Sequence, residues 1–464
     1  MRHGRGRPAA ALALALTLAA APLFAASPGG LSFDDAARLA VAASLELRNA
    51  YATSALQEGA WKLGARAYFP KLSLAASESD RLSLSSTDSF TKNYSLTLEQ
   101  LVWDGGRLAM SRQMERAQLD LGLRQIDRQA LAVADAAISA YRQVLYVRAT
   151  LAIQEAACES LQKQRDILAQ EVALGAALPM SLTEAELTLA QTKIEIINVG
   201  IELQEAEQSL ADTLGLDTLP PLTEEVDVRR SARFPSGETV RALALGRSPQ
   251  LEEARFSLAQ QEVSLKTARL AWLPTIQMKA SAGLTGERYP LSKHNWAVSL
   301  NMDFSSPWLS GSLGGSAGWE APSDYTAAAQ SSLNPVPDLS GALSVRQAEL
   351  ALRLGRESYR DMERQLGRAA ESALEKCGLL EKKRGLALES AALEAERYRL
   401  SELRLSLGQI TRLDLMEARQ DLAKADIAVV EAAVSLLEAE RQLETLLDLP
   451  PGGLAGLLPF SENP

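Results

Sequence analysis

The residue types that support catalysis or metal binding are scarce in this chain. The only histidines are His3, in a segment that reads as a signal peptide, and His294, in an expected loop, so neither a His-based catalytic triad nor a histidine metal site can be built. The only cysteines, Cys158 and Cys377, lack metal-ligand spacing. No glycine-rich phosphate loop with its lysine is present. We therefore predict a protein that is not an enzyme and that uses no cofactor or metal.

One carboxylate pair has a functional interpretation. Asp414 and Glu417 stand at i and i+3 and would share a helix face. A symmetric assembly would repeat them as carboxylate rings, which favour cations and can gate a constriction. The alternative is a capping box, with Thr411 as the N-cap residue and Asp414 at the third helical position. The segment from Ser181 to Glu184 fits the same cap earlier in the chain. On the residues alone we favour capping, and the ring stays open as the alternative.

These residues belong to the second of two similar halves. Residues 39–77 reappear without a gap 204 positions later, so that Pro70 returns as Pro274. A second match, at an offset of 233, relates Gly175 to Gly408. The two offsets differ because the second half holds 29 extra residues. Two copies are too few for a solenoid, so the duplication predicts internal pseudo-symmetry.

Bulk properties restrict the classes of partner. The first 26 residues read as a secretory signal peptide, with arginines ahead of an Ala-rich apolar run. A formal net charge of −10 argues against nucleic acid and against a polybasic membrane anchor. No later segment is apolar enough for a membrane-spanning helix. If the chain enters a bilayer, we expect it to do so through strands.

The duplication also predicts the domain organisation. Each repeat should run helix, strand, loop, strand, very long helix, tip turn and helix. The extra stretch is rich in Ser, Gly, Ala and Pro, and we assign it no regular structure. The expected divisions are a signal peptide (1–26), a first repeat (27–215), a linker (216–238), a second repeat (239–449) with the insertion at about 305–340, and a C-terminal tail (450–464).

Long helices are expected because proline is absent from 71 to 178 and from 338 to 449. One helix should cover residues 107–174. Apolar residues then recur at coiled-coil spacing: Leu386, Leu393, Leu400 and Leu407 in one helix, Ile194, Ile197 and Ile201 in the returning helix of the first half, and Ile427, Val430 and Val434 at the matched positions of the second.

The two cysteines fall inside these long helices at different depths. The axial mismatch between Cys158 and Cys377 is roughly 20 Å at the standard helical rise. A disulfide cannot span that distance, so we expect two buried free thiols.

Four segments alternate apolar and polar residues as strands do. The clearest, residues 296–304, places Trp, Val, Leu, Met and Phe on one face, and 94–99, 72–74 and 276–281 supply three more. A soluble sandwich would alternate too, but aromatic residues at the strand ends resemble the girdles of transmembrane β-barrels. They are Tyr68, Phe69, Phe90, Trp103, Trp272, Tyr289, Trp296 and Trp308.

Four strands per chain imply an oligomer, since an open sheet edge is not tolerated in lipid. Two chains would give eight strands, whose interior is filled by side chains. Three chains would give twelve strands with room for a lumen. For a conduit we therefore predict a trimer.

At this point the motifs resemble the TolC-like outer-membrane efflux protein family, over nearly the whole chain after the signal. Leu31-Ser-Phe-Asp-Asp is similar to the start of the family's first helix. The segments around Pro70 and Pro274 resemble its helix-to-strand junctions, and Asp104-Gly105-Gly106-Arg107 its strand-to-helix motif. Residues 407–418 resemble its periplasmic tip. The second strand-to-helix junction, expected at 304–311, lacks the Asp-Gly-Gly-Arg run, and the first tip has Ser181 where the second has Asp414.

The resemblance implies a fold that is mainly α with a small β part: a homotrimeric 12-stranded β-barrel, four strands per chain, continuing into a periplasmic α-helical barrel. Such a protein would be the outer-membrane exit duct of a tripartite efflux or type I secretion system. It would contact outer-membrane lipid and, through a periplasmic adaptor (membrane fusion) protein, an inner-membrane pump. The tip turns at Gly175, Gly408 and Thr411 would meet the adaptor, and Asp414 and Glu417 would form the gate ring. A periplasmic adaptor or secreted coiled-coil protein without a pore remains the alternative.

Overall fold

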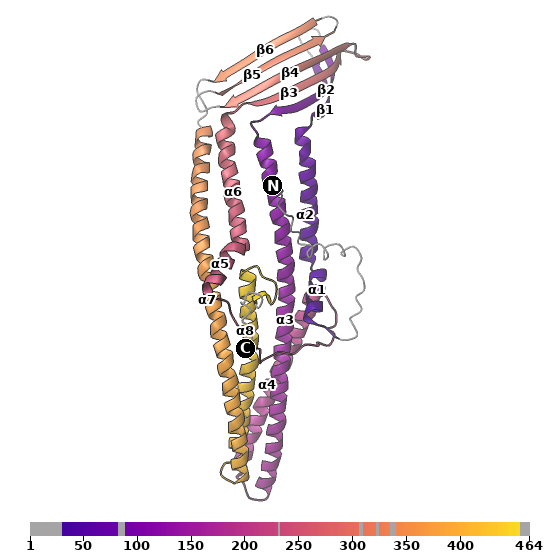
Figure 1. Ribbon diagram of the computed structural model, residues 1–464. Coiled ribbons are helices and arrows are strands. Elements are labelled where there is room, and N and C mark those ends of the chain that lie inside the picture. The colour runs from indigo at the N-terminus through magenta and orange to yellow at the C-terminus, as the bar shows by residue number, and fades with distance from the viewer. Residues whose placement is uncertain are drawn as a thin grey trace. The chain divides into compact units, whose positions relative to one another are not determined.

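The computed structural model describes residues 30–81, 89–230, 233–305, 310–321, 324–334 and 340–454 (Figure 1). The predicted signal peptide, and the C-terminal tail beyond Leu454, lie outside the described residues. Among the described residues, none of the helices combines the length and the apolarity needed to cross a membrane.

The two halves of the described chain have a similar order of elements, except that the second half contains two additional strands, β5 and β6. The first half contains α1 (Phe33–Ala43), α2 (Leu45–Gly64), η1 (Ala65–Tyr68), β1 (Lys71–Arg81), β2 (Ser89–Trp103), α3 (Arg107–Ala173) and α4 (Pro179–Leu214). The second half contains α5 (Gly237–Arg247), α6 (Pro249–Arg269), η2 (Leu270–Trp272), β3 (Thr275–Gly286), β4 (Lys293–Ser305), β5 (Ser310–Glu320), β6 (Asp324–Asn334), α7 (Ser340–Ser406) and α8 (Arg412–Leu446). The fold is mainly α with a small β part, as predicted, and α3 closely matches the expected helix.

The chain divides into two compact units, and each unit draws on both halves. One unit contains the described residues within 1–50, 126–248 and 365–464, and the other those within 51–125 and 249–364. The second unit holds all of the strands that the structure describes.

The core of the first unit forms around Tyr141 of α3. Its side chain is fully buried, and its hydroxyl donates to the Leu31 carbonyl at 2.7 Å. Phe33 packs against the ring, with 4.6 Å between centroids. A buried tyrosine hydroxyl needs such a partner, and this contact fixes the segment entering α1 against α3.

Cys158 and Cys377 are both buried and free, as predicted.

The strands form one antiparallel sheet in the order β1-β2-β3-β4-β5-β6 (Figure 1). The prediction of four strands per chain is therefore wrong. The total of twelve strands in a trimer, which depended on that count, stays a prediction. The two additional strands, β5 and β6, come from the stretch at about 305–340, for which the sequence predicts no regular structure. Gly, Ala and Ser occupy most positions of these two strands.

Two further expectations are corrected here. His294 lies in β4 rather than in a loop, and its ring packs against the Trp319 ring at an interplanar angle of 52°, with 4.9 Å between centroids. Residues 304–311 are not a strand-to-helix junction, because Phe304 belongs to β4, Gly311 belongs to β5, and α7 begins only at Ser340.

Candidate functional site

One face of the sheet is polar over all six strands. A row across it passes from Glu99 to Lys279, Ser299 and Ser316, residues paired in register on neighbouring strands. Parallel rows carry Thr97, Ser281, Asn301, Asp303 and Gln330. Since side chains alternate along a strand, these residues share one surface. This face can border water.

The opposite face is apolar. One row across it contains Trp296, Trp319 and Tyr325, which pair in register on β4, β5 and β6. Farther along the strands lie Val298, Leu300 and Met302, and near the other end Phe304 is level with Gly311 and Leu333. Leu300 is 51% exposed in a single chain. An apolar face with an aromatic row at its end is typical of a surface that meets lipid.

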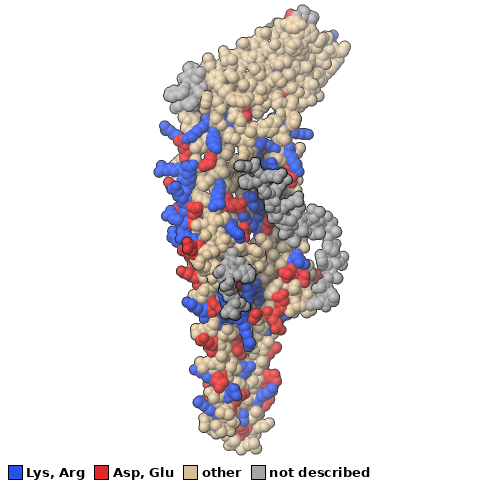
Figure 2. Space-filling model, viewed as in Figure 1, with Lys and Arg blue, Asp and Glu red and all other residues tan. Residues whose placement is uncertain are grey.

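The charge distribution agrees with this assignment. Figure 2 shows few Lys, Arg, Asp or Glu side chains over the sheet in this view, whereas both signs are frequent over the helices. Glu99, Lys279 and Asp303 of the strands belong to the polar face, whereas Glu78 and Lys92 lie on the apolar face, where they form an ion pair at 2.9 Å. The sheet surface is therefore apolar on one side only.

Both proline junctions have the predicted form. Pro70 follows the 3-10 helix η1 and Pro274 follows η2, and a strand begins at the next residue in each case. The preceding residues are extended, with φ −106° and ψ 155° at Phe69 and φ −68° and ψ 139° at Leu273. This follows from the steric clash that keeps a residue before proline out of the helical region.

The strand-to-helix junction after β2 is built around Asp104. Its carboxylate accepts hydrogen bonds from the backbone N–H groups of Gly106, at 2.9 Å, and Leu108, at 2.6 Å. Gly105 and Gly106 have φ of 72° and 82°, a conformation that other residues rarely adopt. Arg107 then donates to the Thr275 hydroxyl at 2.6 Å, which ties the start of α3 to β3.

The two tip turns share one backbone design. Gly175 and Gly408 have φ of 75° and 68°, and each N–H donates to a carbonyl three residues back at 3.0 Å. The following residues, Ala176 and Gln409, donate five residues back at 2.8 and 2.9 Å. This pattern terminates a helix with a left-handed residue, so the glycines at both positions are explained by the turn.

The second tip contains the capping box anticipated from sequence. The Asp414 carboxylate accepts from both the backbone N–H and the hydroxyl of Thr411 at 2.8 Å, and the Thr411 hydroxyl accepts from the Asp414 N–H at 3.2 Å. Asp414 and Glu417 are both exposed. The carboxylate ring stays a prediction.

The first tip lacks that box, so the capping prediction for Ser181 is wrong. Helix α4 begins at Pro179, and its N-cap residue Leu178 makes no side-chain cap. Proline favours the first helical position because its φ is already helical and it has no N–H to satisfy. The helix therefore starts before Ser181 can cap it.

An ion pair joins the two tips, and sequence reasoning missed it. Arg412, the first residue of α8, donates to the Glu171 carboxylate near the end of α3 at 2.6 and 2.9 Å, and to the Gln164 side chain at 3.0 Å. The guanidinium beside it lowers the pKa of Glu171. No repeat or motif marks this pair, since its members lie 241 residues apart.

Farther along, the matched apolar seams differ in exposure. Ile194, Ile197 and Ile201 of α4 are exposed, Ile197 by 61%. Their counterparts Val430 and Val434 of α8 are buried. Helix α7 presents a second exposed apolar stripe at Leu379, Leu386, Leu393, Leu400 and Leu403. Heptad stripes that face solvent in one chain are suited to a partner helix.

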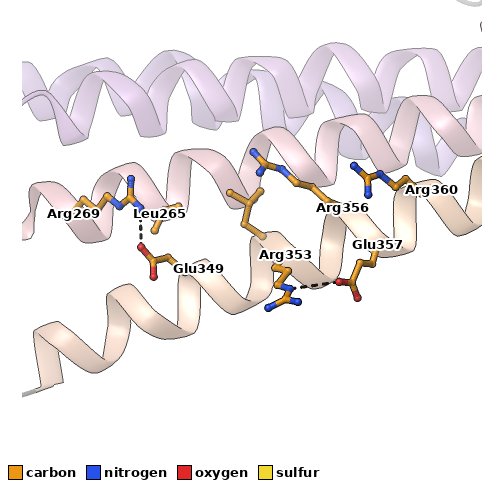
Figure 3. Close-up of a pocket in the computed structure, with 8 residues that line it drawn as sticks. Leu265, Arg269, Glu349, Arg353, Arg356, Glu357 and Arg360 are labelled. Carbon is orange, nitrogen blue, oxygen red and sulfur yellow. Dashed lines mark hydrogen bonds and ion pairs between the residues drawn. The ribbon is translucent and has the colours of Figure 1, made fainter.

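Beside the sheet, ion pairs fasten α6 to α7. Figure 3 shows Arg269 pointing to Glu349, 2.7 Å away, at a cavity of about 400 Å³ that Arg353, Arg356 and Arg360 also line. Arg356 also bonds Glu262 at 3.2 Å. Such exposed pairs contribute little to stability, about 1 kcal/mol or less each, but they orient the two helices.

Within the described ranges, no group of three His, Cys, Asp or Glu side chains is placed to hold a metal ion.

Comparison with known proteins gives a family match over one part of the chain. Residues 36–216, from α1 to just beyond the end of α4, match the family model described as "Outer membrane efflux protein". No curated protein matches the chain by sequence.

Solved structures share the fold over most of the chain. A crystal structure of CusC has a TM-score of 0.74 at 15% identity, over 90% of this chain and 93% of its own. The open state of the Neisseria gonorrhoeae MtrE outer membrane channel gives 0.71 at 16%, over 90% and 89%. The Campylobacter jejuni CmeC outer membrane channel gives 0.70 at 14%, over 91% and 86%.

Proposed function

We propose that this chain, a member of the outer membrane efflux protein family, forms the outer-membrane channel of a tripartite efflux or type I secretion system. The protein lies in the outer membrane and has a large periplasmic part. It acts as a passive exit duct rather than as an enzyme.

The observation that carries this proposal is the two-sided sheet. Leu300, Met278 and Val298 face one side, whereas Asn301, Lys279 and Ser299 face the other. An apolar outer surface around a polar interior is the arrangement of a membrane channel made of strands. A periplasmic protein without a pore has no use for an apolar sheet face of this extent.

The helices supply the second part of the argument. The stripe on α4 and the stripe on α7 are exposed in a single chain, and packing of one copy's stripe on the next would bury both. Three copies would then form a ring of helices. Within this proposal the turns at Gly175, Gly408 and Thr411 are where a periplasmic adaptor docks.

A matched pair of substitutions tests the sidedness of the sheet. Leu300→Arg places a charge on the lipid face, at a cost of about 2–4 kcal/mol near the bilayer midplane, and should reduce the trimer recovered from the outer-membrane fraction. Asn301→Arg, one residue along β4, should leave assembly unchanged. Equal recovery of the two variants would refute the assignment of this face to lipid.

A further inference from the structure

The two edge strands of the sheet are complementary to each other. Among the residues that the structure describes, β1 pairs only with β2 and β6 only with β5, so each leaves one row of backbone groups without a ladder partner there. Both strands are 11 residues long, and β6 is exposed along its whole length. In a bilayer neither edge can stay open.

We propose that β6 of one copy pairs with β1 of the next, so that three copies close an 18-stranded barrel. This rests on the proposed function, because the three copies come from the channel assembly. The six strands alternate in direction, so β6 runs opposite to β1 and the new ladder is antiparallel.

Strand length and side-chain alternation select one register. Pairing end to end places Lys71 opposite Asn334 and therefore Leu72 opposite Leu333 and Ala76 opposite Ala329. All of these last four residues lie on the apolar face of the sheet. A slip by one residue would turn one strand's apolar side chains to the polar face. The end-to-end register therefore keeps both faces continuous.

The same register gives an ordinary barrel tilt. Residues level with Leu72 across the sheet are Leu98, Ala280, Val298, Ala317 and Ala327. Since the proposed partner is Leu333, the register advances by six residues per chain, from 327 to 333. Over three copies the shear equals the strand number. A barrel with equal shear and strand number, such as the eight-stranded TIM barrel, has a tilt of about 36°, within the usual range.

An inserted hairpin fits this scheme because it adds two strands. β4 runs toward the helices, β5 returns, and β6 runs toward the helices again before α7. An odd number of added strands would leave the chain at the end of the sheet away from the helices, where α7 does not begin. Since barrel diameter grows roughly linearly with strand number, the lumen is about half as wide again as that of a twelve-stranded barrel.

The competing arrangement is a twelve-stranded barrel in which β4 pairs with β1 of the next copy and the β5–β6 hairpin stands aside. End-to-end pairing of β4 with β1 would place Ala76 opposite Leu300 and Ser77 opposite Ser299. The proposed barrel instead places Ala76 opposite Ala329 and Ser77 opposite Ala328. Disulfide trapping separates the two, because each pair is close in only one arrangement.

Cysteine pairs would be introduced in the full-length protein in outer membranes and oxidised by dioxygen with copper phenanthroline, which removes two hydrogen atoms per disulfide. Ala76→Cys with Ala329→Cys, on the apolar face, and Ser77→Cys with Ala328→Cys, on the polar face, sample both types of antiparallel pair. At least one should give a reducible product of three chains. Single variants should stay uncrosslinked.

The competing pairs are Ala76→Cys with Leu300→Cys and Ser77→Cys with Ser299→Cys. A disulfide in either of them would overturn the 18-stranded barrel but would not contradict the proposed channel function. A trimer by mass in which no pair links would also overturn it. A protein that is not an oligomer in the outer membrane would instead refute the proposed function.

Discussion

The seams of α4 and α8 have matched sequences and opposite surroundings. Ile197 and Val430 occupy the same position of the two repeats, yet Ile197 is exposed and Val430 buried. Other residues of the same chain cover the apolar seam of α8, whereas the seam of α4 stays exposed. Similar sequences thus form similar helices, but the surrounding elements determine which apolar seam is buried. The exposed seam of α4 is the surface that we expect another copy of the chain to cover.

The largest effect is expected from putting a charge into each seam. Val430→Glu buries a carboxylate without a partner and should destabilise the chain itself by about 3 kcal/mol or more. Ile197→Glu should leave the chain folded but prevent trimer formation. Proteolysis of the solubilised protein reports the first effect, and mass analysis in detergent the second. Equal loss of folding from both would show that the two seams do not differ.

The tips invite a second comparison, since Arg412 links α8 to α3 through Glu171. Arg412→Ala should weaken this link by about 0.5–1 kcal/mol, the range for a partly exposed pair, and should increase leak current through the channel in planar bilayers. Lys424→Ala removes an exposed pair with Asp421 on α8 itself and serves as the control. Equal currents in the two variants would contradict a role for the link.

The same link predicts a pH dependence. Arg412 holds the pKa of Glu171 below its usual range. The ion pair therefore stabilises the contact between α8 and α3 fully at pH values above the ordinary glutamate pKa, about 4.3. It is lost as pH falls through the lowered value. The difference in leak current between wild type and Arg412→Ala should therefore be constant near neutral pH and vanish in acid. If this difference in leak current instead grew as the pH fell, the Arg412–Glu171 ion pair could not be its cause.

The last comparison concerns the caps of the two helices that follow the tip turns. Asp414→Ala should cost about 1 kcal/mol of stability by removing the capping box, whereas Ser181→Ala should cost nothing because Ser181 caps no helix. Glu417→Ala should leave stability unchanged. If the carboxylates also ring a constriction, the Asp414→Ala, Glu417→Ala double variant should lose cation preference in planar bilayers. Unchanged selectivity would leave capping as the only role of Asp414.

Sequence reasoning succeeded where a local rule determines the structure. Pro70 and Pro274 restrict the residue before them, Gly175 and Gly408 end helices, and Thr411 begins one, so all five positions were predictable. The 11-residue strands β5 and β6 were missed because Gly and Ala carry little of the apolar signal that marks a strand. The Arg412–Glu171 pair was missed because two distant residues meet only through tertiary packing.

The exposed stripes on α4 and α7 and the two open sheet edges have a consequence for the life of a single chain. A lone copy presents just those surfaces on which unrelated chains aggregate. In the proposed trimer the two neighbouring copies stabilise each folded chain, so the apparent stability of the chain depends on protein concentration. We therefore expect the dilute, newly exported chain to be susceptible to proteases and to require chaperones, and the assembled protein to resist proteolysis.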